Sequence, residues 1–246
     1  MIAINKLFLV FPEFFFAFLQ GKGYGASDIK QEVKLALKMT NKDYKLAIDI
    51  GGNVGNYSRA LRLKNSDLEI HIFEPSKTNL VKLNNAFSND PLIIVNHCGI
   101  SNVECDSILY SDKAGSGFGS LSKRRLDHFG IQFNVSEAIR LIRFEDYWKE
   151  KLNSRAIDLV KLDIEGHELQ ALESFGSALA VTKVIQFEFG GCNIDTKTYF
   201  QDFWYFFKEH QFDLYRITPF GLQPLNKYTE MDECFRTTNY VAVNQS

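Results

Sequence analysis

Hydrophobic and polar positions alternate between strand-like and helix-like periods from residue 45 onward. Nearly continuous apolar runs predict strands over 45–50, 68–74, 92–98, 156–163 and 183–189, because a strand covered on both faces carries few polar residues. Apolar positions three and four residues apart predict helices over 56–64, 77–87, 145–151, 167–175 and 197–210. This alternation is typical of an α/β fold, a mainly parallel sheet with helices on both faces.

Two regions depart from this alternation. Strands predicted over 212–217 and 239–243 have no long helix between them, only a predicted hairpin at "PFGLQPL", so we expect an antiparallel edge strand. Residues 101–136 hold the loosest stretch, with glycines in alternation and short strands predicted at 106–110 and 137–144 beside it. We predict that this insertion forms a lid, with residues 111–130 over a bound substrate.

The first 44 residues follow a different pattern. A helix is predicted over 27–39, with Ser27 or Asp28 as its cap. The apolar segment "LFLVFPEFFFAFL" at 7–19 is shorter than the roughly 20 residues needed to cross a bilayer. We expect it to pack on the domain, and peripheral contact with a membrane or a partner is the alternative.

Composition and charge restrict the possible partners. The chain has 246 residues and a net charge of −2, so no global basic field indicates nucleic acid, and we expect none as a partner. The basic run "KRR" at 123–125 is predicted to be a solvated loop. Four cysteines without a CxxC pair favour reduced thiols and a cytoplasmic location.

The most informative turn is "DIGGNVG", which ends the first predicted strand and opens a helix. Such turns present free backbone N–H groups to a ligand. Asn53 stands where the dinucleotide fingerprint GxGxxG needs its second glycine, so a dinucleotide is disfavoured. An acidic residue followed by Gly51 and Gly55 fits S-adenosylmethionine instead. We expect Asp49 to order the loop or reach the ammonium of that cofactor, and Asn56 to lie beside it.

The next two strands end in further candidates. Glu74, in "IFEP", follows Asp49 by 25 residues. A carboxylate at this position can accept hydrogen bonds from both ribose hydroxyls of a nucleoside. The third strand ends in "NHCGIS", which places Cys98 and Gly99 where an adenine would lie.

A second acidic group lies in "VKLDIEGHE" at 160–168. Lys161, Asp163 and Glu165 alternate, so they point to one side of the strand if its geometry persists. Ionisable groups at the end of a buried strand are costly unless they are paired or used. A structural Lys161–Asp163 ion pair and a catalytic role for Asp163 or Glu165 both remain open, and His167 can cap or flank the next helix.

"DIGGNVGNYS", "IFEP", "LVKLDIEGHE" and "VIQFEF", in this order, closely resemble FkbM-type S-adenosylmethionine-dependent methyltransferases. The resemblance covers about residues 45–243. It implies a Rossmann-like class I methyltransferase fold with a mostly parallel seven-stranded sheet, and methyl transfer to a hydroxyl of a sugar, glycan or secondary metabolite. Gly52 and His167 depart from the common alanines of the motifs. We therefore expect an N-terminal helical, apolar extension at 1–44 and a methyltransferase domain at 45–246.

A hydroxyl acceptor benefits from a general base, for which Asp163, Glu165, His167 and His128 are candidates. Asp163 and Glu188 could instead hold Mg²⁺, although no metal is the preferred prediction. An N-methyltransferase, or another Rossmann-fold enzyme with a nucleotide cofactor, is the alternative function. A non-catalytic cofactor-binding module is a third. The sequence does not identify the acceptor or the oligomeric state.

Overall fold

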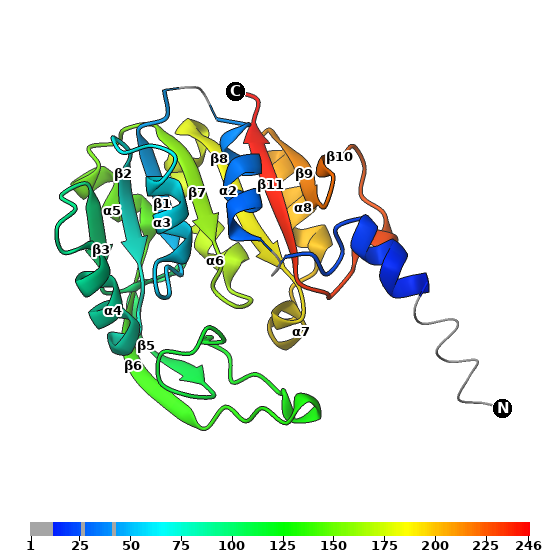
Figure 1. Ribbon diagram of the computed structural model, residues 1–246, viewed down its shortest axis with the longest axis horizontal. Coiled ribbons are helices and arrows are strands. Elements are labelled where there is room, and N and C mark those ends of the chain that lie inside the picture. The colour runs from blue at the N-terminus through cyan, green and yellow to red at the C-terminus, as the bar shows by residue number, and fades with distance from the viewer. Residues whose placement is uncertain (1–11, 26–27, 41–42) are drawn as a thin grey trace.

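An eight-stranded sheet forms the centre of the computed structural model, which describes residues 12–25, 28–40 and 43–246 (Figure 1). Its strand order is β10-β9-β11-β8-β7-β1-β2-β3. The bounds are β1 (Leu46–Ile50), β2 (Glu69–Phe73), β3 (Ile93–Asn96), β7 (Ile157–Leu162), β8 (Thr182–Phe189), β9 (Phe212–Thr218), β10 (Gly221–Leu225) and β11 (Thr238–Asn244). All but β10 and β11 run in the same direction, so the sheet is mostly parallel.

The predicted count of seven strands was wrong. The expected hairpin has a second arm long enough to pair, and β10 adds an eighth strand antiparallel to β9. Strand β11 is also antiparallel, but it pairs with both β8 and β9 and therefore lies inside the sheet. The antiparallel edge strand is β10 alone.

Helices cover both faces of the sheet. On one face lie α2 (Ile29–Leu37), α3 (Asn56–Arg62) and α4 (Lys77–Phe87), and on the other α5 (Phe144–Lys151), α6 (Glu168–Glu173) and α8 (Phe200–Glu209). Each buries an apolar stripe; in α8 the stripe consists of Phe200, Phe203, Trp204 and Phe207. Asp28 caps α2 by accepting from the backbone N–H of Lys30 at 2.9 Å, whereas Ser27 lies outside the described residues.

A second, three-stranded sheet lies below the carboxyl ends of the parallel strands in Figure 1. It consists of β4 (Gly99–Ile100), β6 (Val135–Ile142) and β5 (Cys105–Ser111), in that order. The loop 112–134 connects β5 to β6 and contains the short 3₁₀ helix η1 (Asp127–Phe129). Sequence periodicity missed three other short elements, η2 (Gly176–Val181), α7 (Cys192–Thr196) and η3 (Glu230–Asp232).

Residues 12–19 form a further helix, which projects from the body of the molecule beyond β11 (Figure 1). Residues 7–11 of the apolar segment lie outside the described residues. Among the described helices, none is long and apolar enough to cross a membrane. The domain boundary predicted at residue 44 remains a prediction; α2, which precedes it, packs directly against the sheet and α3.

Candidate active site

The candidate site lies where β1 and β7 end side by side. Strand order reverses here, since the chain continues from β1 to β2 on one side and returns to β7 on the other. Asp163 donates its backbone N–H to the Ile50 carbonyl at 3.1 Å. A Cβ on Gly51, where φ is +84°, would lie 1.9 Å from the Asp163 carbonyl oxygen, so only glycine fits. Ligands of open α/β sheets bind at such switch points.

Asp49 is buried beneath the glycine loop and does not line the neighbouring pocket. It accepts a hydrogen bond from the Ser58 hydroxyl at 2.5 Å, and burial raises the pKa of its carboxyl to about 6. Gly55 and Asn56 begin α3 outside the pocket wall, and the Asn56 side chain accepts from Arg59 at 3.0 Å. The structure thus places Asp49 where it can order the loop.

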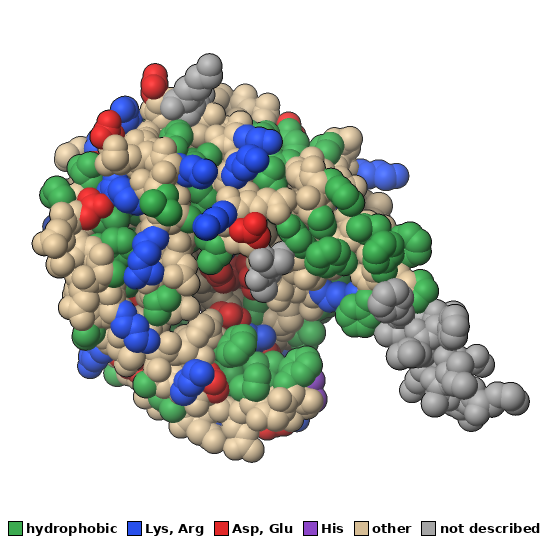
Figure 2. All heavy atoms as spheres, in the orientation of Figure 1, with side chains coloured by type: hydrophobic (Ala, Val, Ile, Leu, Met, Phe, Trp, Pro, Cys, Tyr) green, Lys and Arg blue, Asp and Glu red, His purple; other side chains and the backbone are tan. Residues whose placement is uncertain are grey.

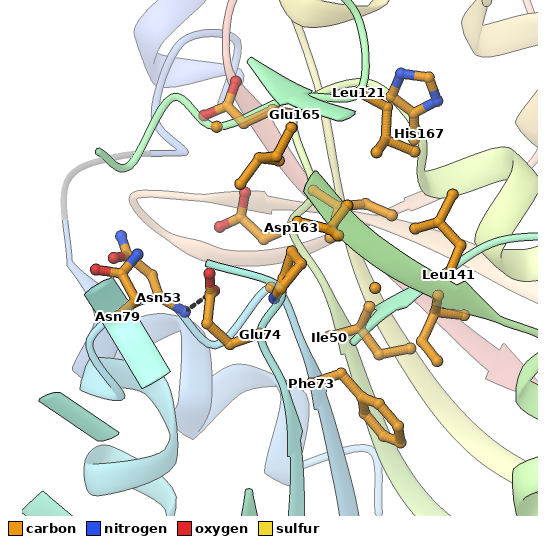
Figure 3. Close-up of a pocket in the computed structure, with 18 of the residues that line it drawn as sticks. Ile50, Asn53, Phe73, Glu74, Asn79, Leu121, Leu141, Asp163, Glu165 and His167 are labelled. Atoms are coloured by element: carbon orange, nitrogen blue, oxygen red, sulfur yellow. Dashed lines mark hydrogen bonds between the residues drawn. The ribbon is translucent and has the colours of Figure 1, made fainter. Parts of the chain in front are cut away.

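Glu74 enters the pocket from the end of β2 (Figure 3). Its Oε2 accepts from the backbone N–H of Asn53 at 2.8 Å, and its Oε1 accepts from that of Ser76 at 2.9 Å. The residue is only 5% exposed, and burial raises the pKa of its carboxyl to about 7. Each carboxylate oxygen can accept a further hydrogen bond from a ligand.

This first pocket, the cofactor pocket, has a volume of about 630 Å³, including some space open to solvent. One part is polar, with Asn53, Glu74 and Asp163. The other is apolar, formed by Phe73, Pro75, Ile100, Leu109, Ile139 and Leu141. Gly99 lines the pocket as predicted, whereas Cys98 packs against the core and burial raises the pKa of its thiol to about 11.

Several lining residues were not predicted. Asn79, in the first turn of α4, and Ser116, Gly117 and Leu121, from loop 112–134, close the pocket. Asn79 could have been found from its position shortly after Glu74, at the start of a helix. Asn53 has a left-handed backbone with φ of 47°, and its buried Oδ1 lacks a hydrogen-bond partner among the described residues. An unsatisfied buried acceptor fits a ligand that carries a donor.

A second hollow, the acceptor pocket, adjoins the first and has a volume of about 1450 Å³, including open solvent. The two share Gly51, Asn53, Gly117, Asp163 and Glu165 as walls. Figure 2 shows acidic side chains inside a hollow and hydrophobic side chains at its border. The other walls include Glu32, Lys161, Glu188, Arg124, Tyr57, Phe118, Phe129, Phe235 and Arg236.

Lys161, Asp163 and Glu165 all line the acceptor pocket, as their alternation predicted. The Lys161 ammonium lies 3.2 Å from Asp163 Oδ2, so the structure contains the ion pair that the sequence left open. Burial lowers the pKa of Lys161, but the carboxylates of Asp163, Glu32 and Glu188 outweigh it and raise that pKa overall. The ammonium therefore stays charged among these carboxylates.

The Lys161 ammonium already pairs with Asp163, and the charge of Glu188 also acts on it. Among the described residues, no group of three or more His, Cys, Asp or Glu side chains could hold a metal ion. The alternative of a magnesium site thus has no support.

Arg124 corrects the expectation that the run at 123–125 is solvated. Its side chain is 8% exposed, and its guanidinium pairs with Glu165 and, at 3.3 Å, with Asp195 of α7. Burial and the nearby Asp163 charge raise the pKa of Glu165 to about 8, and Arg124 offsets part of this shift. Lys123 and Arg125 on either side are exposed. The basic run therefore contains one partly buried residue, Arg124, between two solvated ones.

The two histidines lie in different places. His167 precedes α6 and lines the cofactor pocket, where its Nε2 lies 3.1 Å from the Ser122 hydroxyl and burial lowers its pKa to about 4. His128 lies on η1 outside both pockets, with its ring against Phe129. The structure therefore does not bring His128 to the other candidate residues.

Comparisons with known proteins bear on the family and the fold of the chain. A family model described as the methyltransferase FkbM domain matches residues 49–214. A comparison with curated proteins gives no match. A solved structure of a putative O-methyltransferase from Klebsiella pneumoniae aligns with 89% of this chain and 81% of its own, at 10% identity and a TM-score of 0.50.

Two other solved structures are similar at lower TM-scores. A putative methyltransferase from Streptococcus mutans in complex with SAH aligns over 87% of this chain and 96% of its own, at 12% identity and a TM-score of 0.48. An rRNA methylase from Streptococcus thermophilus aligns over 87% and 95%, at 12% identity and a TM-score of 0.43. At 10% identity the Klebsiella pneumoniae structure supports the fold alone, and the acceptor stays open.

Proposed function

Because the chain belongs to the FkbM methyltransferase family, we propose that it transfers a methyl group to a hydroxyl oxygen of a sugar, glycan or secondary metabolite. Methyl transfer from S-adenosylmethionine is the activity that the family and the fold support. The choice of an oxygen acceptor is the further step. The observation that carries it is the Asp163 carboxylate, which lines both pockets and is 39% exposed.

The residues of the cofactor pocket fit S-adenosylmethionine. Glu74 can accept from the ribose hydroxyls, the apolar walls around Ile100 and Leu141 suit an adenine, and the orphaned Asn53 Oδ1 suits a donor on the methionine portion. When bound, this cofactor supplies a methyl group already activated on a sulfonium sulfur. The protein must then position the acceptor, exclude water and remove a proton.

Asp163 is the residue best placed to remove that proton. It stands at the wall between the pockets, and the Lys161 ammonium at 3.2 Å holds its carboxylate in place. A hydroxyl acceptor needs such a base more than an amine acceptor does, since its proton is far less acidic. Lys161 is a positioning residue in this scheme.

The other candidates are less suited to the role. Burial, reinforced by the charges of Asp163 and Glu165, raises the pKa of Glu188 well above its ordinary value, which disfavours its charged form. Glu165 is engaged by Arg124. His167 lines the cofactor pocket and not the acceptor pocket.

The walls of the acceptor pocket also favour a hydroxyl-rich molecule over a nucleic acid. Four carboxyl groups line it (Glu32, Asp163, Glu165 and Glu188), and two of its three basic side chains, Lys161 and Arg124, are paired with acidic residues of that wall. Such a surface offers little to a phosphate backbone. The absence of a nucleic-acid partner and a cytoplasmic location both remain predictions.

The direct test is an acceptor screen with S-adenosylmethionine carrying a labelled methyl group. We expect label in products that are stable to base and lack a new N-methyl signal in NMR spectra. Label found only on amines would contradict an oxygen acceptor, and label found only on RNA would contradict a sugar, glycan or secondary metabolite as the acceptor.

A further inference from the structure

The helix at residues 12–19 exposes an unusual amount of aromatic surface. Phe14, Phe15, Phe16 and Phe18 are 55%, 50%, 61% and 42% exposed. Single exposed apolar side chains are common on protein surfaces, but a contiguous group of this kind marks an interaction site. Figure 2 shows hydrophobic side chains gathered where this helix projects in Figure 1.

The direction of these side chains indicates what covers them. Successive helical residues point about 100° apart, so Phe14, Phe15 and Phe16 extend around more than half of the helix. A groove on a protein partner would cover one face only. A helix that is apolar all round suits a core or a lipid phase, and in this chain the helix lies outside both hydrophobic clusters.

None of the helices in the described part of the chain is long and apolar enough to cross a membrane. A helix can instead lie in the plane of the headgroups with its apolar side chains inserted. The one ionisable side chain of the helix at residues 12–19, Glu13, lies 3.3 Å from the guanidinium of Arg236. Apolar side chains therefore dominate the surface that this helix presents.

The helix is also fixed beside the acceptor pocket. The Arg236 guanidinium lies 4.1 Å from the centroid of the Phe14 ring, and Arg236 itself lines that pocket. The connecting segment reaches the same wall, since the backbone N–H of Gly25 donates to the Thr237 carbonyl at 3.0 Å and both residues line the pocket. Phe118 and Phe129 of the lid, also exposed, line the pocket as well.

We propose that residues 12–19 insert their phenylalanines into the surface of a lipid bilayer, so that the acceptor pocket opens at the headgroup region. The acceptor is then a hydroxyl carried on a lipid, a refinement that rests on the proposed function. The arrangement places the pocket mouth where a lipid-linked head group can reach Asp163 without leaving the membrane.

The test is flotation of the full chain with phosphatidylcholine vesicles, with and without phosphatidylglycerol. The variant carries Phe14→Ser, Phe15→Ser, Phe16→Ser and Phe18→Ser. The matched control carries Leu63→Ser, Val81→Ser, Val103→Ser and Phe220→Ser, four exposed apolar side chains that line neither pocket of the site. S-adenosylhomocysteine binding is measured on the same samples.

We expect wild type and control to float with vesicles containing phosphatidylglycerol, and the variant to bind them at least about tenfold more weakly. Binding should persist at high salt, because insertion is apolar. Absence of vesicle binding by the wild type, equal binding by the variant, or loss of a wild-type dimer as the variant's only change would overturn the proposal. Failure of all three proteins to bind S-adenosylhomocysteine would count against the proposed function and leave the vesicle result standing.

Discussion

Glu74 holds the backbone N–H groups of Asn53 and Ser76 before any ligand arrives. The carboxylate is therefore fixed in position by the loop that it helps to shape. A ligand therefore binds a hydrogen-bond acceptor that is already ordered. Little binding free energy is then lost in ordering this carboxylate.

We expect Glu74→Ala to weaken S-adenosylhomocysteine binding about 100-fold, because two charge-assisted hydrogen bonds to the ribose are lost. Isothermal titration calorimetry measures this change. Glu104→Ala, which removes an exposed carboxylate from a surface pair with Arg140, serves as the control and should bind normally. A Glu74→Ala protein that is folded and binds with wild-type affinity would contradict the assignment.

The substitution Asp163→Asn tests whether Asp163 is the general base. It should lower kcat about 10²- to 10⁴-fold, because an amide cannot take up the acceptor proton. S-adenosylhomocysteine affinity should change by less than about threefold, since the amide keeps the shape of the wall. If kcat fell by this factor in Glu188→Gln and did not fall in Asp163→Asn, the general base would be Glu188 and not Asp163.

The sequence predicted the site residues that lie at the ends of strands, and it missed the site residues that the loop 112–134 contributes. Gly51, Asn53, Glu74, Gly99 and Asp163 were predicted because the ends of parallel strands meet at one edge of the sheet. Arg124 and Leu121 reach the site from a loop of irregular conformation, for which no periodicity predicts a direction. His128 lines neither pocket, and composition alone could not show this because it gives no direction for a loop side chain.

The loop 112–134 is tied to the site by side chains of one segment. Ser120 donates to the Glu165 carbonyl at 2.8 Å, Ser122 meets His167 at 3.1 Å, and Arg124 pairs with Glu165 and Asp195. These contacts join the loop to the end of β7 and to α7. The loop can therefore open only if these polar contacts break.

Arg124→Ala should open this loop, because it leaves two largely buried carboxylates without their cation. We expect thermolysin to cleave between residues 111 and 130 at least about tenfold faster than in wild type. The exposed neighbour provides the control, Arg125→Ala, which should be cleaved at the wild-type rate. Saturating S-adenosylhomocysteine should slow cleavage of the wild type, and unchanged cleavage would count against the lid.

Most elements followed from hydrophobic periodicity. Strands β1, β2, β7 and β8 and helices α3, α4 and α8 lie within a few residues of their predicted bounds, because each has a long apolar pattern of one period. The two-residue strand β4 and the short helices α7 and η3, of five and three residues, are too short to display a period. The pairing of β11 inside the sheet is a long-range property that no local pattern contains.

The whole molecule carries a group of buried acids whose pKa values burial raises above those of free carboxyls. They are Glu32 (about 7), Asp49 (about 6), Glu74 (about 7), Glu165 (about 8) and Glu168 (about 7). Between their unfolded and folded pKa values the folded chain binds more protons than the unfolded chain. Stability must then fall as pH rises through this window.

We expect the free energy of unfolding of the ligand-free protein to fall by about 1–3 kcal/mol between about pH 6.5 and about pH 8.5. His71 and His167, whose pKa values burial lowers, act in the opposite direction only below about 6.5. Urea unfolding at several pH values measures the slope. Glu32→Gln should flatten it, Glu104→Gln should not, and a stability that rises over this range would contradict the prediction.

Strand β11 has a consequence for the order in which the chain acquires its structure. Tyr240 pairs with Phe187 of β8 on one side and with Arg216 of β9 on the other. During synthesis on the ribosome, both neighbours emerge before residues 238–244 and expose unpaired edges at the middle of the sheet, where they are open to aggregation. Gly25 is synthesised early, but its backbone N–H can donate to the Thr237 carbonyl only after Thr237 has emerged. Pulse proteolysis of ribosome-bound chains of increasing length should therefore show protection of β8 and β9 only after residue 244 has emerged.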